Sequence, residues 1–223
     1  MKFRHEWKHE ISFEDLLILR MRLPQIMKRD SHSVGNRYEI RSLYFDTPTD
    51  TALLDKINGV NRREKFRIRY YNGDTSFILL EKKSKINGLC AKESCRISES
   101  EARKIVEGNT EWMKTADRPL CRELYRKMQT QLLKPKTIVD YTREAFVYAP
   151  GNVRVTMDHH IRTGCFRTNF LDSDVLTIPA GDQAIVLEVK WDEFLPSVIK
   201  NAVSLTGRRA SAFSKYQKCR IYG

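Results

Sequence analysis

The sequence predicts an α+β fold in which a closed antiparallel β-barrel surrounds a charged lumen and helices pack outside it. Two observations lead to this fold class. Short segments in which apolar and charged residues alternate, the pattern of a strand with two unlike faces, recur along the 223 residues. In five of these segments the charged face carries Arg or Lys, in most cases with a single carboxylate. Closing such a sheet into a barrel turns the charged faces toward one lumen and leaves the apolar faces for helices to cover.

The alternation is clearest in residues 63–83, which we expect to form two strands joined by a tight turn at 72–74. One face of the first strand carries Lys65, Arg67, Arg69 and Tyr71, and the opposite face carries Phe66, Ile68 and Tyr70. On the second strand Glu81 and Lys83 share a face, opposite Ile78 and Leu80. The apolar face of this hairpin must be buried, so the charged face either meets solvent or lines a site.

Four other segments repeat this design. Their charged faces carry, in chain order, Arg4, Glu6 and Lys8; Tyr141 and Arg143; Arg154, Thr156 and Asp158; and Glu188 and Lys190. A face exposed to solvent would more often mix Thr, Ser and Gln with both charge signs. Repetition over five segments therefore favours one shared lumen.

The first half of the chain otherwise alternates between short helices and strands. Ser12 can cap a helix that continues to Leu23 and is ended by Pro24. A strand at 38–45 and a short helix at 49–57 follow. After the hairpin we expect a strand at 88–97, with Lys92 on its charged face, and a helix that runs from a Ser98–Glu101 capping box to about residue 107.

The second half begins with a helix at 117–133, which Pro135 stops. Strands at 136–148 and 152–161, a strand at 183–191 and a helix at 196–205 complete the pattern. Residues 29–36 and 162–175 are expected to be loops. Because the helices lie between the strands, without a linker or a repeat, we expect one domain covering residues 1–223.

Composition indicates the kind of partner. Forty Lys and Arg against 28 Asp and Glu give a net charge of +12, which favours a polyanion. Nucleic acid is disfavoured because the cations alternate with apolar residues and not with exposed aromatic ones. The sequence contains no apolar run of membrane-spanning length and no signal peptide, so we expect a cytoplasmic protein. Five cysteines without C-x-x-C spacing indicate reduced thiols.

Seven short motifs, taken together and in order, resemble a known family. They are E-W-K at 6–8, S-L-Y-F-D-T-P at 42–48, R-I-R at 67–69, L-E-K-K at 80–83, Y-T-R-E-A at 141–145, L-E-V-K at 187–190 and F-S-K-Y at 213–216. This set is similar to the polyphosphate polymerase domain of the vacuolar transporter chaperone (VTC) family, within the triphosphate tunnel metalloenzyme (CYTH-like) superfamily. Each motif is weak alone, but the ordered set spans nearly the whole chain.

The resemblance implies a phosphotransferase that moves the γ-phosphoryl group of ATP to a growing polyphosphate chain. The residues that it places on the triphosphate and the polymer in catalytic roles are Lys8, Arg67, Arg69, Lys83 and Arg143. Those expected to bind the same polyanion along the tunnel are Arg4, Lys92, Tyr141, Arg154, Lys190, Ser214 and Lys215. Arginine suits this task because its planar fork matches phosphate oxygens and stays charged at physiological pH.

The resemblance also implies a divalent metal, Mn²⁺ or Mg²⁺, which needs hard oxygen ligands. Glu188 matches the acidic residue with which the polymerase family holds its metal. Glu6, Glu81 and Asp158 are further candidate ligands, or else structural ion-pair partners of the lumen cations. These four acids are too few to neutralise the predicted cations, so the empty lumen should be self-repelling and should favour anions.

Three functional classes remain open at this stage. Triphosphate hydrolases of the superfamily begin with E-x-E-x-K, whereas this chain has Arg4 in the first acidic position, which favours polymerisation over hydrolysis. A hydrolase of triphosphate or of an organic phosphate, and a non-catalytic polyphosphate-binding module, are the alternatives. Eukaryotic relatives join this domain to membrane-spanning parts; here a membrane partner would have to be a separate chain. The preferred metal, the acceptor, the adenine-binding residues, the oligomeric state and the fate of the product are not specified by the sequence.

Overall fold

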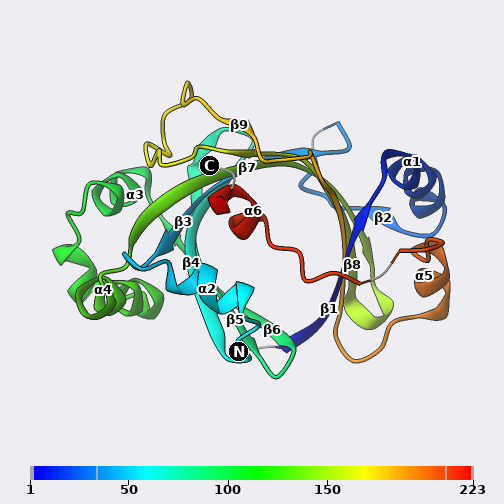
Figure 1. The fold of residues 1–223 in the computed structure, drawn as a ribbon, viewed down its shortest axis with the longest axis horizontal. Helices are drawn as coiled ribbons and strands as arrows, with labels where there is room; N and C mark the ends of the chain where they lie inside the picture. The colour runs from blue at the N-terminus through cyan, green and yellow to red at the C-terminus, as the bar shows by residue number, and fades with distance from the viewer. Residues whose placement is uncertain (1–2, 34, 209, 222–223) are drawn as a thin grey trace.

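Eight antiparallel strands form a closed ring in the structure, a computed structural model that describes residues 3–33, 35–208 and 210–221 (Figure 1). Around the ring the order is β7, β3, β4, β5, β6, β1, β10 and β8, and β8 pairs with β7 to close it. The strands are β1 (Phe3–Ile11), β3 (Tyr38–Asp46), β4 (Arg63–Tyr71), β5 (Asp74–Ile86), β6 (Leu89–Ile97), β7 (Lys134–Tyr148), β8 (Val153–Thr163) and β10 (Ile185–Trp191). The predicted barrel is confirmed. Two short strands that were not predicted, β2 (Lys28–Arg29) and β9 (Ile178–Pro179), pair with β7 and β8 respectively, and the loop expected at 29–36 therefore begins one residue later.

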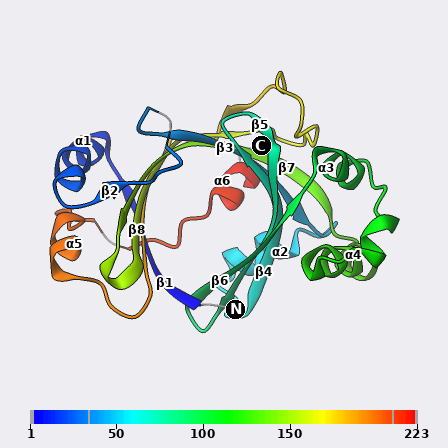
Figure 2. The same cartoon turned by 180° about the vertical axis from the view of Figure 1, so that it is seen from behind.

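Helices cover two sides of the barrel wall, as predicted (Figures 1 and 2). One side carries α3 (Glu99–Val106) and α4 (Pro119–Gln131), and the other carries α1 (Phe13–Arg22) and α5 (Ser197–Ala202), while α2 (Thr51–Ile57) follows β3 at the rim. Outward apolar side chains of the strands, such as Phe66 and Val155, are buried against these helices. Single 3-10 turns lie at Leu23–Gln25, Glu111–Thr115 and Pro150–Asn152. Within the described residues, no helix has both the length and the apolar character needed to cross a membrane.

Local chemistry explains the predicted element ends. Ser12 and Asp15 form a capping box at α1, and Ser98 and Glu101 form another at α3. The β4–β5 turn has positive φ at Asn72 (51°) and Gly73 (72°), the conformation that an Asn-Gly pair favours in a two-residue hairpin loop.

A sixth helix, α6 (Lys215–Ile221), was not predicted and lies inside the ring rather than outside it (Figures 1 and 2). It packs on the inner face of the wall, where the Tyr216 ring stacks on Tyr44 with centroids 5.0 Å apart. Cys219 is fully buried, and its carbonyl oxygen accepts a 3.0 Å hydrogen bond from the Thr163 hydroxyl. Seven residues are too few to form a stable helix alone, so α6 depends on these tertiary contacts.

Asp46 connects the end of β3 to both α2 and α6. Its fully buried carboxylate accepts hydrogen bonds from the backbone N–H groups of Thr47 (2.8 Å), Ala52 (2.8 Å) and Leu53 (3.1 Å). It also accepts a 2.6 Å bond from the Tyr216 hydroxyl. One side chain thus fixes the start of α2 and holds α6 in the lumen.

We expect Asp46→Ala to lower the free energy of unfolding by about 2–4 kcal/mol, because four donors, among them the buried Tyr216 hydroxyl, would lose a charged acceptor. Urea denaturation followed by circular dichroism measures this loss. The matched control is Asp117→Ala, at an exposed position, which should change stability by less than about 0.5 kcal/mol. Equal effects of the two substitutions would contradict the connecting role of Asp46.

Candidate functional site

The inner face of the barrel gathers the residues that the sequence placed on the charged strand faces. Glu81, Asp158 and Glu188 are almost fully buried there, with Arg67 and Arg69 beside the first of them. The structure also brings into this lumen Lys8, Glu6, Lys83, Lys92, Tyr141, Arg143, Lys190 and, from the C-terminal segment, Ser214 and Lys215. Every candidate acid lies within ion-pair distance of at least two cations.

Glu81 is the acid of the first cluster. Arg67 donates to it from Nε at 2.7 Å, with the Tyr44 hydroxyl 2.7 Å from the opposite side of the guanidinium, and Lys92 Nζ lies 3.0 Å away. Arg69 is 4.0 Å from the same carboxylate and donates to Ser42 (2.9 Å) and to the Tyr141 hydroxyl (2.8 Å). Burial opposes ionisation of Glu81, but the guanidinium of Arg67 and its neighbours hold its pKa well below the usual value. Both arginines are therefore committed to fixed partners.

Asp158 is the acid of the second cluster. Arg143 binds it with two parallel bonds of 2.6 and 2.7 Å, and Lys215 Nζ lies 2.5 Å from the same carboxylate. The Tyr141 ring lies between the cations, within 5.4 Å of the Arg143 guanidinium and 4.8 Å of Lys215. This arrangement anchors α6 to the wall through charge.

Glu6 and Glu188 form the third cluster, together with Lys8 and Lys190. Lys8 Nζ lies 2.5 Å from Glu6 and 3.5 Å from Glu188, and Lys190 Nζ lies 3.4 and 3.2 Å from the same two acids. Burial would raise the pKa of Glu188, but the ammonium groups of Lys190 and Lys8 hold it well below its usual value. Two carboxylates thus share two ammonium groups.

Arg4 and Arg154 have acidic partners that the sequence analysis missed. Arg4 Nε lies 2.8 Å from Asp192, and Arg154 lies 2.5 Å from Asp30 and donates to the Tyr38 hydroxyl at 2.7 Å. The four acids named from the sequence are therefore not the only neutralising groups. The strand pattern could not reveal Asp30 and Asp192, because both lie outside the ring strands.

An open cavity of about 380 Å³ extends from Glu6, Lys8 and Lys190 of the third cluster to the rim of the barrel. Among the residues that the structure describes, nine cationic side chains and two acids line it: Arg4, Lys8, Lys56, Arg63, Lys65, Lys83, Lys85, Lys92 and Lys190, with Glu6 and Glu64. Sequence reasoning did not include Lys56, Arg63, Lys65 or Lys85 in the site. Lys65 shares the strand parity of Arg67 and could have been included, whereas Lys56 comes from a helix and had no such signal.

The amines of Lys83 and Lys65 lie where the surrounding acids do not compensate for a positive charge. Among the described residues Lys83 has no hydrogen-bond or ion-pair partner, and burial, with Lys190 and Arg67 nearby, holds its pKa well below the usual value. Burial lowers the pKa of Lys65 to about 8, and its Nζ has Ser214 as a distant hydrogen-bond acceptor at 3.4 Å. The excess positive charge that the sequence predicted is therefore concentrated at this cavity.

The acids differ in how well they suit a divalent metal. Mg²⁺ and Mn²⁺ are commonly held by one or two carboxylates, with water and phosphate oxygens completing the shell. The Glu6–Glu188 pair supplies that number, whereas Glu81 and Asp158 are single carboxylates among cations. Glu188 also has cationic neighbours, with Arg143 at 3.6 Å in addition to Lys8 and Lys190. Over residues 3–33, 35–208 and 210–221 there is no cluster of three or more His, Cys, Asp or Glu that could hold a metal ion. The residues present fit a metal that shares its coordination with phosphate at Glu6 and Glu188.

We expect Lys83→Met to raise the melting temperature of the ligand-free protein by roughly 3–6 °C, because it removes a polar amine that burial desolvates and that has no hydrogen-bond or ion-pair partner among the described residues. Lys82→Met is the matched control on the same strand. Lys82 points outward and lies 2.5, 3.5 and 3.6 Å from Glu123, Glu93 and Glu64, so its loss should lower or preserve the melting temperature. Scanning calorimetry of both variants measures the difference, and a lower melting temperature for Lys83→Met would refute the self-repelling lumen.

Comparison with solved structures shows the same fold in distant proteins. A Hippeastrum protein that is called an adenylyl cyclase is described as having a dominant triphosphatase activity. It superposes on this chain with a TM-score of 0.54 at 12% sequence identity, and the superposition covers 90% of this chain and 83% of the Hippeastrum protein. A Bacillus halodurans protein that is called an adenylate cyclase superposes with a TM-score of 0.51 at 16% sequence identity, over 85% of this chain and 80% of that protein. A Pyrococcus horikoshii protein superposes with a TM-score of 0.53 at 11% sequence identity, over 97% of this chain and 99% of that protein.

Sequence comparison is more specific about the family. No curated protein sequence matches the chain. The family model of the VTC domain, however, matches residues 3–221, nearly the whole chain. The chain therefore belongs to the VTC domain family, and its barrel has the same fold as the distant proteins compared above.

Proposed function

We propose that this protein is a metal-dependent polyphosphate polymerase, which transfers the γ-phosphoryl group of ATP to a polyphosphate chain held in the lumen. The observation that carries the proposal is the imbalance of nine cations against two acids around the 380 Å³ cavity. Such a site is costly when empty and favourable when a polyanion occupies it. The VTC family match supports polymerisation over the other reactions of the tunnel fold.

Ion pairing divides the cations into two groups with different tasks. Lys83 and Lys65 are free to contact phosphate directly, and Lys8 and Lys190 can turn toward it from the shared acids. Arg67, Arg69 and Arg143 would stabilise the phosphates through their charge without contacting them directly. Their guanidinium groups are held by Glu81, Tyr141 and Asp158 respectively. The attacking group is a terminal phosphate oxygen that already carries charge, so the protein has to align two anions rather than remove a proton.

Glu188 and Glu6 would hold the divalent ion, Mg²⁺ or Mn²⁺. When bound, such an ion supplies positive charge to the phosphate oxygens. Lys8 and Lys190, which now share these two acids, would then be released onto the phosphates. The same lumen could support triphosphate hydrolysis, so the reaction has to be identified from its products.

Glu188→Gln should reduce ATP turnover by about 100-fold, because it removes the charge that the metal needs. Metal-free binding of tripolyphosphate should persist or become tighter, because Lys8 and Lys190 lose one shared acid. Gel electrophoresis and ³¹P NMR of reactions with ATP and Mn²⁺ or Mg²⁺ should show long phosphate chains and ADP for the wild type. Glu193→Gln, at an exposed position, is the matched control and should behave like the wild type.

Each outcome of this experiment separates two functions. Orthophosphate as the sole product would assign the protein as a hydrolase. Tight polyphosphate binding without metal-dependent turnover of ATP, GTP or triphosphate would assign a binding module. Normal turnover by Glu188→Gln would contradict its role as a metal ligand.

Arg67→Ala is a poor variant for testing phosphate binding, because it would leave buried Glu81 without its closest partner. Lys83→Met would remove a proposed phosphate contact without breaking an ion pair.

Polyanion binding should take up protons near pH 8. Lys65 has its pKa lowered from 10.5 to about 8, so above pH 8 the empty site loses this charge, and a bound anion restores the proton. Affinity for tripolyphosphate should therefore fall above pH 8, by up to about tenfold per pH unit for each proton taken up. Calorimetry at pH 8 in two buffers of different ionisation enthalpy measures the uptake. Lys65→Arg, which stays charged, should reduce it, and an unchanged uptake would exclude Lys65 as its source.

A further inference from the structure

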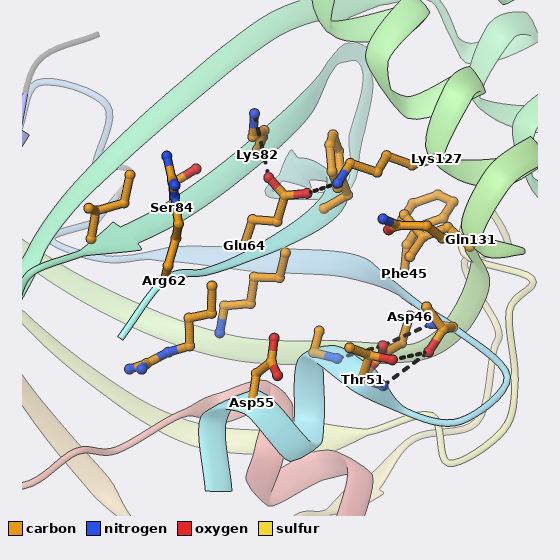
Figure 3. Close-up of a pocket in the computed structure, with 17 residues that line it drawn as sticks. Phe45, Asp46, Thr51, Asp55, Arg62, Glu64, Lys82, Ser84, Lys127 and Gln131 are labelled. Atoms are coloured by element: carbon orange, nitrogen blue, oxygen red, sulfur yellow. Dashed lines mark hydrogen bonds and ion pairs between the residues drawn. The ribbon is translucent and has the colours of Figure 1, made fainter. Parts of the chain in front are cut away.

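A second cavity, of about 450 Å³, lies outside the barrel between α2 and α4 (Figure 3). It shares five lining residues with the lumen cavity: Ala52, Arg63, Glu64, Lys65 and Ser84. Three of these are consecutive at the start of β4, so the two cavities meet across the rim of the barrel at that strand. A molecule whose one end lies in the lumen can therefore place its other end outside.

The two cavities differ in their chemistry. In the outer one, Glu64 forms ion pairs with both Lys82 and Lys127 (Figure 3). Lys82 has a second acid, Glu123, at 2.5 Å. Apolar surface comes from Ala52, Ile86 and Leu133. Among the described residues, five cations and three acids line this cavity, against nine and two in the lumen cavity, so the partly apolar outer groove suits an uncharged group better than the lumen does.

Two polar side chains of the outer cavity have unused hydrogen-bonding capacity. Asp55 of α2 and Gln131 at the end of α4 extend into it from opposite sides (Figure 3). Within the described residues, neither the Asp55 carboxylate nor the Gln131 amide makes a hydrogen bond or an ion pair. A half-buried carboxylate without a cation is unusual in a chain of charge +12.

We propose that the outer cavity binds the nucleoside of a nucleoside triphosphate whose phosphates lie in the lumen. The proposal rests on the function proposed above. A carboxylate can accept hydrogen bonds from the ribose hydroxyls, and a side-chain amide can both donate to and accept from the edge of a base. Lys65, which lines both cavities, lies where the sugar joins the phosphates. The enzyme would thus distinguish its nucleotide donor from the polyphosphate product outside the barrel, away from the reacting phosphates.

Methyl triphosphate is the probe that isolates the nucleoside, because it has the triphosphate monoester of ATP and no base or ribose. The wild type should bind ATP about tenfold more tightly than methyl triphosphate in calorimetric titrations. The double variant Asp55→Ala/Gln131→Ala should bind both equally, with the affinity for methyl triphosphate unchanged. Gln129→Ala, at an exposed position on the same helix that does not line the cavity, is the matched control and should retain the preference.

Photolabelling with 8-azido-ATP gives an independent measurement, and the modified peptides should contain residues 51–62 or 127–133. Equal binding of ATP and methyl triphosphate by the wild type would overturn the nucleoside site and leave the lumen function intact. A preference for ATP that survives in the double variant would overturn the assignment to this cavity. Failure of the wild type to bind either compound would overturn the proposed function, and this inference with it.

Discussion

Mutual repulsion among the lumen cations is the constraint on which the rest of this structure depends. A closed barrel forces the inward side chains of eight strands into one narrow space, where charges interact strongly and water screens them little. The structure limits the repulsion by sharing: Glu81, Asp158 and the Glu6–Glu188 pair each hold two or more cations. Lys83 shares no acid among the described residues, and burial beside Lys190 and Arg67 lowers its pKa instead.

Tyrosine rings complete this arrangement inside the barrel. Tyr44 lies beneath Lys65 and Arg67, and Tyr141 lies beneath Arg69, Arg143 and Lys215, all with cation-to-centroid distances below 6 Å. Each ring offers its negative face to cations, while its hydroxyl accepts a bond from a neighbouring arginine. The tyrosines therefore spread charge in a region where additional carboxylates would oppose the binding of an anion.

The barrel and its inner face could be predicted from the sequence because strand alternation has a strict period of two. That rule alone placed Arg67 opposite Phe66 and Glu188 opposite Leu187, and both charged residues lie in the lumen. It could not place Asp30 or Asp192, whose positions depend on how loops return to the barrel. The helix α6 was missed for a related reason, since seven residues form a helix there only because Asp46, Asp158 and the inner wall bind them.

The order of the strands around the ring has a consequence for how the chain folds during synthesis. β1 pairs with β10, and these partners are separated by roughly 180 residues, the kind of non-local contact that slows folding. Until residues 185–191 have left the ribosome, β1 and β8 are unpaired edges of an open sheet. The cationic inner faces of the earlier strands are then exposed to solvent. Pairing of β10 with β1 and β8 closes the ring and encloses these faces.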